Sequence, residues 1–190
     1  MDLRELDRRT LLLLDKMVAG VTPTDLARPT PCAGWTLADL LRHQVSENHA
    51  FATAAREGSA PDWDAGVLGD DAYAAYQASV EDFLDAFAGD AVLERQLTIN
   101  HFGTFPGSIA AHMHLVDTLA HGWDLARTLG LPYEPDAEAV STASKLAERI
   151  PDEGREKNGS FAHSVEVPAD ASPLDRFLAL LGRDPAWTLS

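Results

Sequence analysis

Four long segments of this chain repeat apolar residues three or four positions apart, and each is followed by a glycine. That spacing matches the 3.6-residue turn of an α-helix with one buried face. Thr36 stands where a hydroxyl caps the second helix, and Gly58 stands where that helix ends. The pattern predicts a mainly all-α chain whose core is an up-down four-helix bundle. The predicted helices cover residues 3–19, 37–57, about 71–88 and about 106–130.

The rest of the chain is expected to decorate this bundle. "PDAEAVSTASKLAERI" predicts a fifth helix and "PLDRFLALLG" a short last one. "AHSVEVP" is the best strand candidate, while "ERQLTINHFGTF" suits either a short strand or an extended connection. We expect a single domain over 1–190, with the bundle at about 1–150 and a C-terminal extension at about 151–190. The extension should pack through five apolar residues: Phe161, Val165, Leu174, Phe177 and Leu178.

Composition narrows the range of partners. The 190 residues carry a formal charge of −15 and no cluster of Lys and Arg, which nucleic acids and anionic membranes require. Charges interrupt the apolar run near the N-terminus, so it is expected to be neither a signal peptide nor a membrane span. Cys32 is the single cysteine and has no internal disulfide partner. These features predict a cytoplasmic protein with no nucleic-acid or membrane partner.

The fourth segment contains "HMHLVDTLAHGWDLARTLG", which is unusually rich in polar groups for an apolar helix. At about 100° per residue, His114, Asp117 and His121 fall within an arc of roughly 60°, with Asp124 at its border. Asp117 and His121 are four residues apart, so both side chains can reach one ion. The alternative is a solvent-facing stripe on which Asp117 and His121 form an ordinary helix-surface pair.

The second segment offers a third ligand. His43 and Glu47 share one stripe of "LADLLRHQVSENHA", and metal sites in bundles are built from side chains on facing helices. His43 would be a ligand, and Glu47 an outer partner of the site or a base. The alternatives are a partly buried, hydrogen-bonded His43 and a solvated Glu47. His114, one turn before Asp117, is the main rival for a ligand position.

Other candidates carry weaker arguments. Cys32 suits a small buried group at the turn into the second helix, with a nucleophile as the alternative. Arg42 and Arg127 are possible clamps for an anionic substrate, with surface solvation as the alternative. His101 is a candidate for a cavity mouth, whereas His49 is expected at the surface. The sequence has no CxxC pair, no GxSxG elbow and no dinucleotide fingerprint.

Three blocks together resemble the DinB-like superfamily, which includes the mycothiol-dependent maleylpyruvate isomerases. They are "TPCAGWTLADLLRHQV", "HMHLVDTLAHGWDLARTLG" and "ASPLDRFLALLGRDPAW". The resemblance implies a four-helix bundle holding a divalent ion, commonly zinc or nickel, on three side chains. The implied ligands are His43, Asp117 and His121. Asp117 stands where the isomerases have Glu and many relatives have His.

The resemblance also implies a chemistry. In the isomerases the ion activates the thiol of mycothiol for addition to a small electrophile, and a metal-bound thiol is deprotonated near neutral pH. We therefore expect a metal-dependent transferase or isomerase whose partners are a small thiol and an electrophilic substrate. Glu47, His114 and Asp124 are the candidate catalytic groups for taking the thiol proton. The alternative is a non-catalytic metal-binding module, and the apolar faces of such bundles make a homodimer plausible.

Overall fold

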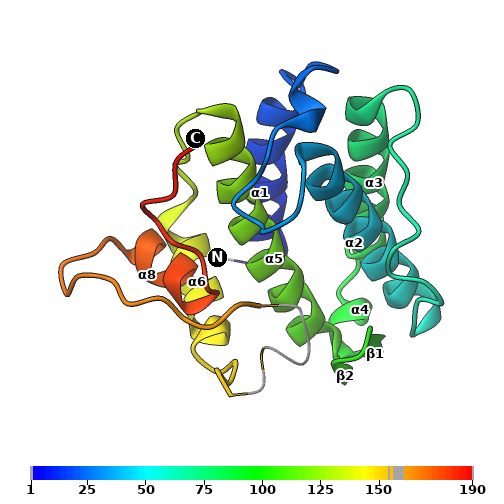
Figure 1. The fold of residues 1–190 in the computed structure, drawn as a ribbon. Helices are drawn as coiled ribbons and strands as arrows, with labels where there is room; N and C mark the ends of the chain where they lie inside the picture. The colour runs from blue at the N-terminus through cyan, green and yellow to red at the C-terminus, as the bar shows by residue number, and fades with distance from the viewer. Residues whose placement is uncertain (1, 154, 156–160, 190) are drawn as a thin grey trace.

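The computed structural model describes residues 2–153, 155 and 161–189. Four long helices form a bundle in which α1 and α2 each contact both α3 and α5 (Figure 1). The prediction of a mainly all-α chain with a four-helix bundle as its core is confirmed. Among the described residues, no helix is both long and apolar enough to cross a membrane. The long helices are α1 (Leu3–Val18), α2 (Leu37–Glu57), α3 (Ala72–Ala86) and α5 (Gly107–Leu129).

Helix direction follows the order up, down, down, up. The segment between α2 and α3 returns along α2, where Asp64 pairs with Arg42 and the Gly66 amide donates to Ser46 Oγ at 2.9 Å. Helix α3 therefore starts beside the N-terminal half of α2 and runs in the same direction (Figure 1). A simple alternation holds for α1 with α2 and for α3 with α5. The predicted up-down alternation is therefore wrong for the α2–α3 pair, because the apolar period is the same for either direction of a helix.

The ends of α2 show why this sequence forms the helix where it does. Thr36 and Asp39 form a capping box: Thr36 Oγ1 accepts from the Asp39 amide at 3.3 Å, and Asp39 Oδ2 accepts from the Thr36 amide at 2.9 Å. Gly58 ends the helix with a φ of 94°, which costs little only for glycine. Asp39 is thus committed to the cap, while His43 and Glu47 lie one and two turns further along.

A short hairpin connects α3 to α5. Helix α4 (Ala91–Glu94) leads into β1 (Gln96–Ile99), which pairs antiparallel with β2 (Gly103–Pro106). Leu97 is buried opposite Phe105. The structure thus resolves "ERQLTINHFGTF" as strand. "AHSVEVP" is not a strand, and that prediction was wrong. Among the described residues, its Val165 amide donates to the Ala179 carbonyl.

A second apolar cluster lies behind α5, where α6 (Ala137–Ala147) and α8 (Pro173–Leu180) pack. Phe177 and Leu178 of the extension are buried there, and Phe161 and Leu174 pack at its edge. Val165 is 37% exposed, so its predicted packing role was wrong. Residues 154 and 156–160 of the predicted extension lie outside the described residues.

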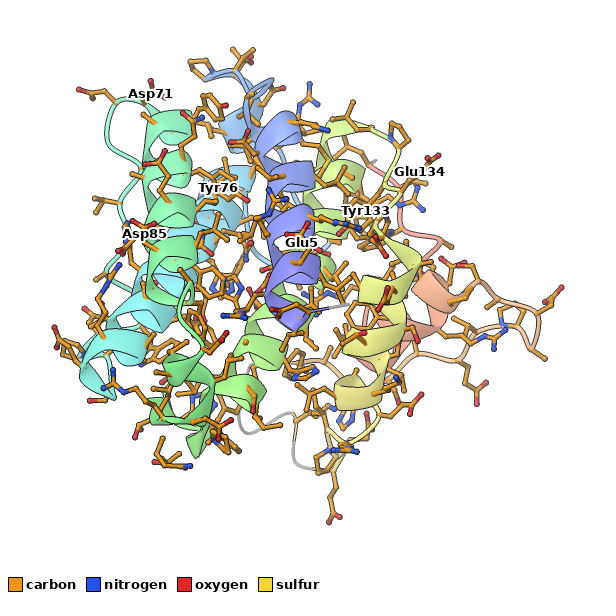
Figure 2. The ribbon with its side chains drawn as sticks, turned by 180° about the vertical axis from the view of Figure 1, so that it is seen from behind. Glu5, Asp71, Tyr76, Asp85, Tyr133 and Glu134 are labelled. Atoms are coloured by element: carbon orange, nitrogen blue, oxygen red, sulfur yellow. The ribbon has the colours of Figure 1, made fainter. Side chains whose placement is uncertain are left out.

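Helix α5 is central because it contributes buried residues both to the apolar core inside the bundle and to this second cluster. Trp123, on the face turned away from the bundle interior, is 2% exposed within the second cluster. Two tyrosines bind to helices through their hydroxyls: Tyr76, buried in α3, donates to the Leu11 carbonyl of α1, and Tyr133, partly buried in the segment after α5, donates to the Leu119 carbonyl of α5. Figure 2 shows Tyr76 between α3 and α1 and Tyr133 on the other side of α1. A helix covered on so many sides must find a partner for every polar group it carries.

Candidate metal centre

Three of the predicted residues converge between α2 and α5. His43, Asp117 and His121 each offer one ligand atom, and these atoms lie within 4.8 Å of one another. Both imidazole Nε2 atoms are 3.4 Å from the same oxygen, Asp117 Oδ1. The two rings stand edge to face with centroids 4.7 Å apart. Two imidazoles and one carboxylate form a donor set that suits zinc, nickel or ferrous iron.

The outer face of His121 fixes which nitrogen is offered. Its Nδ1 lies 2.9 Å from Asp124 Oδ2, a carboxylate oxygen that can only accept, so Nδ1 carries a proton. The lone pair of neutral His121 is then on Nε2, which faces Asp117 and His43. Metal-binding histidines are typically held by a carboxylate in this way. Asp124 therefore lies behind the His121 ring and orients it.

Charge in the cluster is arranged for a cation. Burial would raise the pKa of Asp117, but the His121 and His43 imidazoles hold it well below its usual range. Burial would lower the pKa of His121, but Asp117, Asp124 and Cys32 raise it well above its ordinary value. Without an ion, the cluster thus retains a carboxylate and an imidazolium. A divalent cation would displace that proton and take its place beside Asp117.

Two neighbours of the cluster define its walls. Gln44 Nε2 donates to Asp117 Oδ2 at 2.8 Å, which fixes the carboxylate with Oδ1 turned toward the imidazoles. Trp35 stacks on His121 with centroids 6.0 Å apart and is tilted against His43 at 5.1 Å. His43 and Asp117 keep about a quarter of their side-chain surface exposed, so the cluster opens to solvent on their side.

Glu47 lies one turn along α2 from His43. Burial and the neighbouring Asp117 charge together raise its pKa to about 8, while His121 opposes this. The carboxyl group is thus mostly protonated at neutral pH when no ion is bound. A carboxyl group whose pKa is close to neutral pH, beside a polar cluster, is suited to proton transfer.

A second cluster shares His121 from its other side. Cys32 Sγ lies 3.8 Å from His121 Nδ1 and donates to Asp124 Oδ2 at 3.2 Å. Burial would raise the pKa of Asp124, but Arg183 and His121 lower it to about 2. Cys32, Arg183, Gln44 and Trp35 were not among the predicted site residues. The available signal was that Cys32 and Trp35 lie in "TPCAGW", directly before the helix that carries His43.

His114 lies in a different network. It is 1% exposed, with Nδ1 at 2.8 Å from Asp7 Oδ2 and Nε2 at 2.9 Å from Asn48 Oδ1. Its ring stacks on Phe83 with centroids 3.6 Å apart. Both nitrogens are therefore engaged away from Asp117, and the structure does not bring His114 together with the three convergent residues. Within one turn of α5, the exposed fraction of the side chain falls from 24% at Asp117 to 1% at His114.

The remaining candidates lie apart from the cluster. Arg42 pairs with Asp64 on the crossover segment, and Arg127 lies 5.3 Å above the Trp123 ring. Neither contributes to the cluster. The other histidines are also held elsewhere: His49 by Asp82, His112 by the Ser108 carbonyl, His163 by Asp152, and His101 beside Phe102.

Comparison with known proteins identifies the family and a similar fold. Two Mycobacterium tuberculosis proteins, uncharacterized protein MT0763 of strain CDC 1551 / Oshkosh and uncharacterized protein Rv0738 of strain H37Rv, are each 29% identical over 168 residues. Those matches cover 88% of this chain and 90% of each relative. The fold resembles the crystal structure of the mycothiol-dependent maleylpyruvate isomerase, with a TM-score of 0.65 at 15% identity, covering 86% of this chain and 74% of that one. Residues 12–126, more than half of the chain, match the mycothiol maleylpyruvate isomerase N-terminal domain, and the chain belongs to that family.

Proposed function

We propose that the chain is a divalent-metal-dependent enzyme that uses a low-molecular-weight thiol, mycothiol or a close analogue. The enzyme would either transfer this thiol to a small electrophile or use it to isomerise one. The observation that carries the proposal is the convergence of His43, Asp117 and His121 with the Asp124 carboxylate behind His121. The family and the fold likeness support the choice of thiol, because mycothiol is named in both.

The donor set fits zinc or nickel. His43 and His121 would each bind through Nε2 and Asp117 through Oδ1, with Gln44 holding the other carboxylate oxygen. When bound, the ion would supply Lewis acidity that lowers the pKa of a thiol toward neutral. Among the described residues this group has three ligands, which leaves a coordination position for an exogenous thiol. Cys32 lies on the Nδ1 side of His121, so it does not complete the same group.

The chain's own residues would manage the proton and the substrate. The pKa of Glu47 is about 8 without an ion, and a bound dication beside it would lower that pKa, so Glu47 could then ionise, accept the thiol proton and return it. The partly exposed face of His43 and Asp117 would give the thiol access, and Trp35 would shield the ring faces of both histidines from water. A closed structural site would instead bury its ligands and have four of them.

Metal analysis and a thiol-dependent assay test the proposal together. Wild-type protein should hold about one zinc or nickel per chain, and His121→Ala should lose it. Turnover of maleylpyruvate, or conjugation of monochlorobimane, should require mycothiol and disappear in His43→Ala. His112→Ala is the matched control, because His112 lies on α5 but its Nδ1 bonds to the Ser108 carbonyl, away from the cluster. Equal metal in wild type and His121→Ala would refute the centre; bound metal without thiol-dependent turnover would favour a non-catalytic module.

A further inference from the structure

Asp124 is held from three separate parts of the chain. Its Oδ2 accepts from His121 Nδ1 at 2.9 Å, from Arg183 Nη2 at 3.1 Å and from Cys32 Sγ at 3.2 Å. The carboxylate is fully buried, and its Oδ1 has no hydrogen-bond partner among the described residues. All of the bonds that fix its orientation therefore converge on one oxygen. Arg183 comes from the segment after α8, outside the residues 12–126 that define the family match.

We infer that Arg183 is a positioning residue: it anchors Asp124, and through Asp124 it orients His121 toward the ion. The inference rests on the proposed metal centre and deepens it. It assigns part of that centre to the C-terminal extension, which packs behind α5 and would otherwise serve only the second apolar cluster.

The backbone around Arg183 presents its side chain rigidly. The Arg183 amide donates to the Leu178 carbonyl at 3.0 Å and its Nη1 donates to the Leu181 carbonyl at 3.2 Å. Gly182 closes the helix with a φ of 80°, and a Cβ there would lie 2.7 Å from the Ala162 carbonyl oxygen. Only glycine is accommodated at that turn. The Arg183 side chain is 12% exposed, so its guanidinium is held against Asp124 in a largely dry setting.

Loss of Arg183 would leave Asp124 fully buried with one fixed cationic donor fewer. Cys32 is a weak donor, and His121 is itself the ring that needs holding. The carboxylate would then be free to turn its unpartnered Oδ1 toward either neighbour. His121 would rotate more freely, and its Nε2 would spend less time directed at Asp117. Removing an outer partner of a metal-bound histidine typically weakens metal binding by about 10–100-fold.

The competing role for Arg183 is simply to dock the extension. Arg176 offers the matched control, because it lies on α8 and donates to the Ala171 carbonyl without contacting Asp124. Phe177 and Leu178 stay in place in either variant and keep the extension packed. A docking role would affect Arg183→Gln and Arg176→Gln through stability alone. A positioning role would also change the ligand field at the metal.

The test measures zinc affinity by competition with a chromophoric chelator, and the visible spectrum of the cobalt(II)-loaded protein. Arg183→Gln should bind zinc about 10-fold more weakly and shift the cobalt bands, whereas Arg176→Gln should leave both unchanged. Arg183→Lys should recover part of the affinity, since it keeps the cation. Because Arg183 acts through Asp124, the double variant Asp124→Asn/Arg183→Gln should bind zinc no more weakly than Asp124→Asn alone.

Circular dichroism of each variant shows whether it is folded. If Arg183→Gln loses helical signal, the zinc affinity of Arg183→Lys tests the inference instead. Wild-type affinity in Arg183→Gln, or fully additive losses in the double variant, would overturn the inference while leaving the metal centre intact. A wild-type protein that binds no zinc, nickel or cobalt would overturn the proposed centre and this inference with it. The wild-type measurement therefore distinguishes the two failures.

Discussion

Replacing Glu47 with Gln should remove a pH-dependent penalty from the metal-free protein. Burial and the Asp117 charge raise the pKa of Glu47 from its ordinary value of 4.5 to about 8. The folded state therefore holds a proton that the unfolded state releases once the pH exceeds about 4.5. By linkage, the contribution of Glu47 to the free energy of unfolding is fully present below that pH and falls as the pH rises toward 8.

The size of the effect follows from the two pKa values. Each pKa unit corresponds to about 1.4 kcal/mol, so the interval from 4.5 to about 8 sets an upper bound of roughly 5 kcal/mol. Glu47 keeps some contact with solvent, and screening there reduces the expected loss to about 2 kcal/mol. Glutamine keeps the shape of the side chain and does not ionise. The stability of Glu47→Gln relative to wild type should therefore increase by about 2 kcal/mol between pH 5 and pH 8.5.

Urea unfolding of both proteins in chelator, followed by circular dichroism at half-unit steps of pH, measures this directly. Adding zinc gives a second readout, because a nearby dication lowers the pKa of Glu47 and should shrink the gap between the two proteins. Parallel pH profiles for wild type and Glu47→Gln would refute the reasoning. They would mean that the carboxyl is ionised across the range and is not the near-neutral acid of the centre.

Two further substitutions test the surroundings of the centre. His114→Ala should lower the free energy of unfolding by about 3–5 kcal/mol, because it leaves Asp7 buried without its partner. The zinc affinity of this variant should change less than about twofold, and a larger loss would mean that His114 is a ligand. Gly66→Ala would place a Cβ 2.6 Å from the Ser46 amide nitrogen, so the segment between α2 and α3 must shift, at a cost of about 1–3 kcal/mol in the free energy of unfolding. Urea unfolding measures this cost as a lower midpoint, and an unchanged midpoint would show that the segment adapts without cost.

Much of the fold is predictable because it depends on local chemistry. The 3.6-residue apolar period located all four long helices, and Thr36, Gly58 and Gly130 marked their ends by capping and left-handed turns. The direction of α3 is different, because it depends on where residues 59–71 travel. A connection of that length can cross the bundle, whereas the apolar period is the same for either direction of a helix.

The site was predictable to the same depth. A spacing of four places Asp117 and His121 together, and the stripe on α2 supplies His43. His114 lies on the same face of α5 as Asp117 and His121, but its side chain is more deeply buried, because nearly every side of α5 is covered. Nothing in the spacing distinguishes those two depths. The distinction comes from Asp7 on α1, which is more than one hundred positions away.

Three buried or partly buried polar groups of α5 are each matched by a different element. His114 is held by Asp7 of α1, Asp117 by Gln44 of α2, and Asp124 by Arg183 beyond α8. A buried polar helix is stable only if all of these partners are present, so the bundle and the extension must both assemble before the helix is satisfied. Between His114 and Asp124, Asp117 is the position of α5 that keeps partial exposure to solvent, with 24% of its side chain exposed. The same pairing that stabilises α5 therefore leaves the proposed metal centre open to solvent through Asp117, in the middle of the helix.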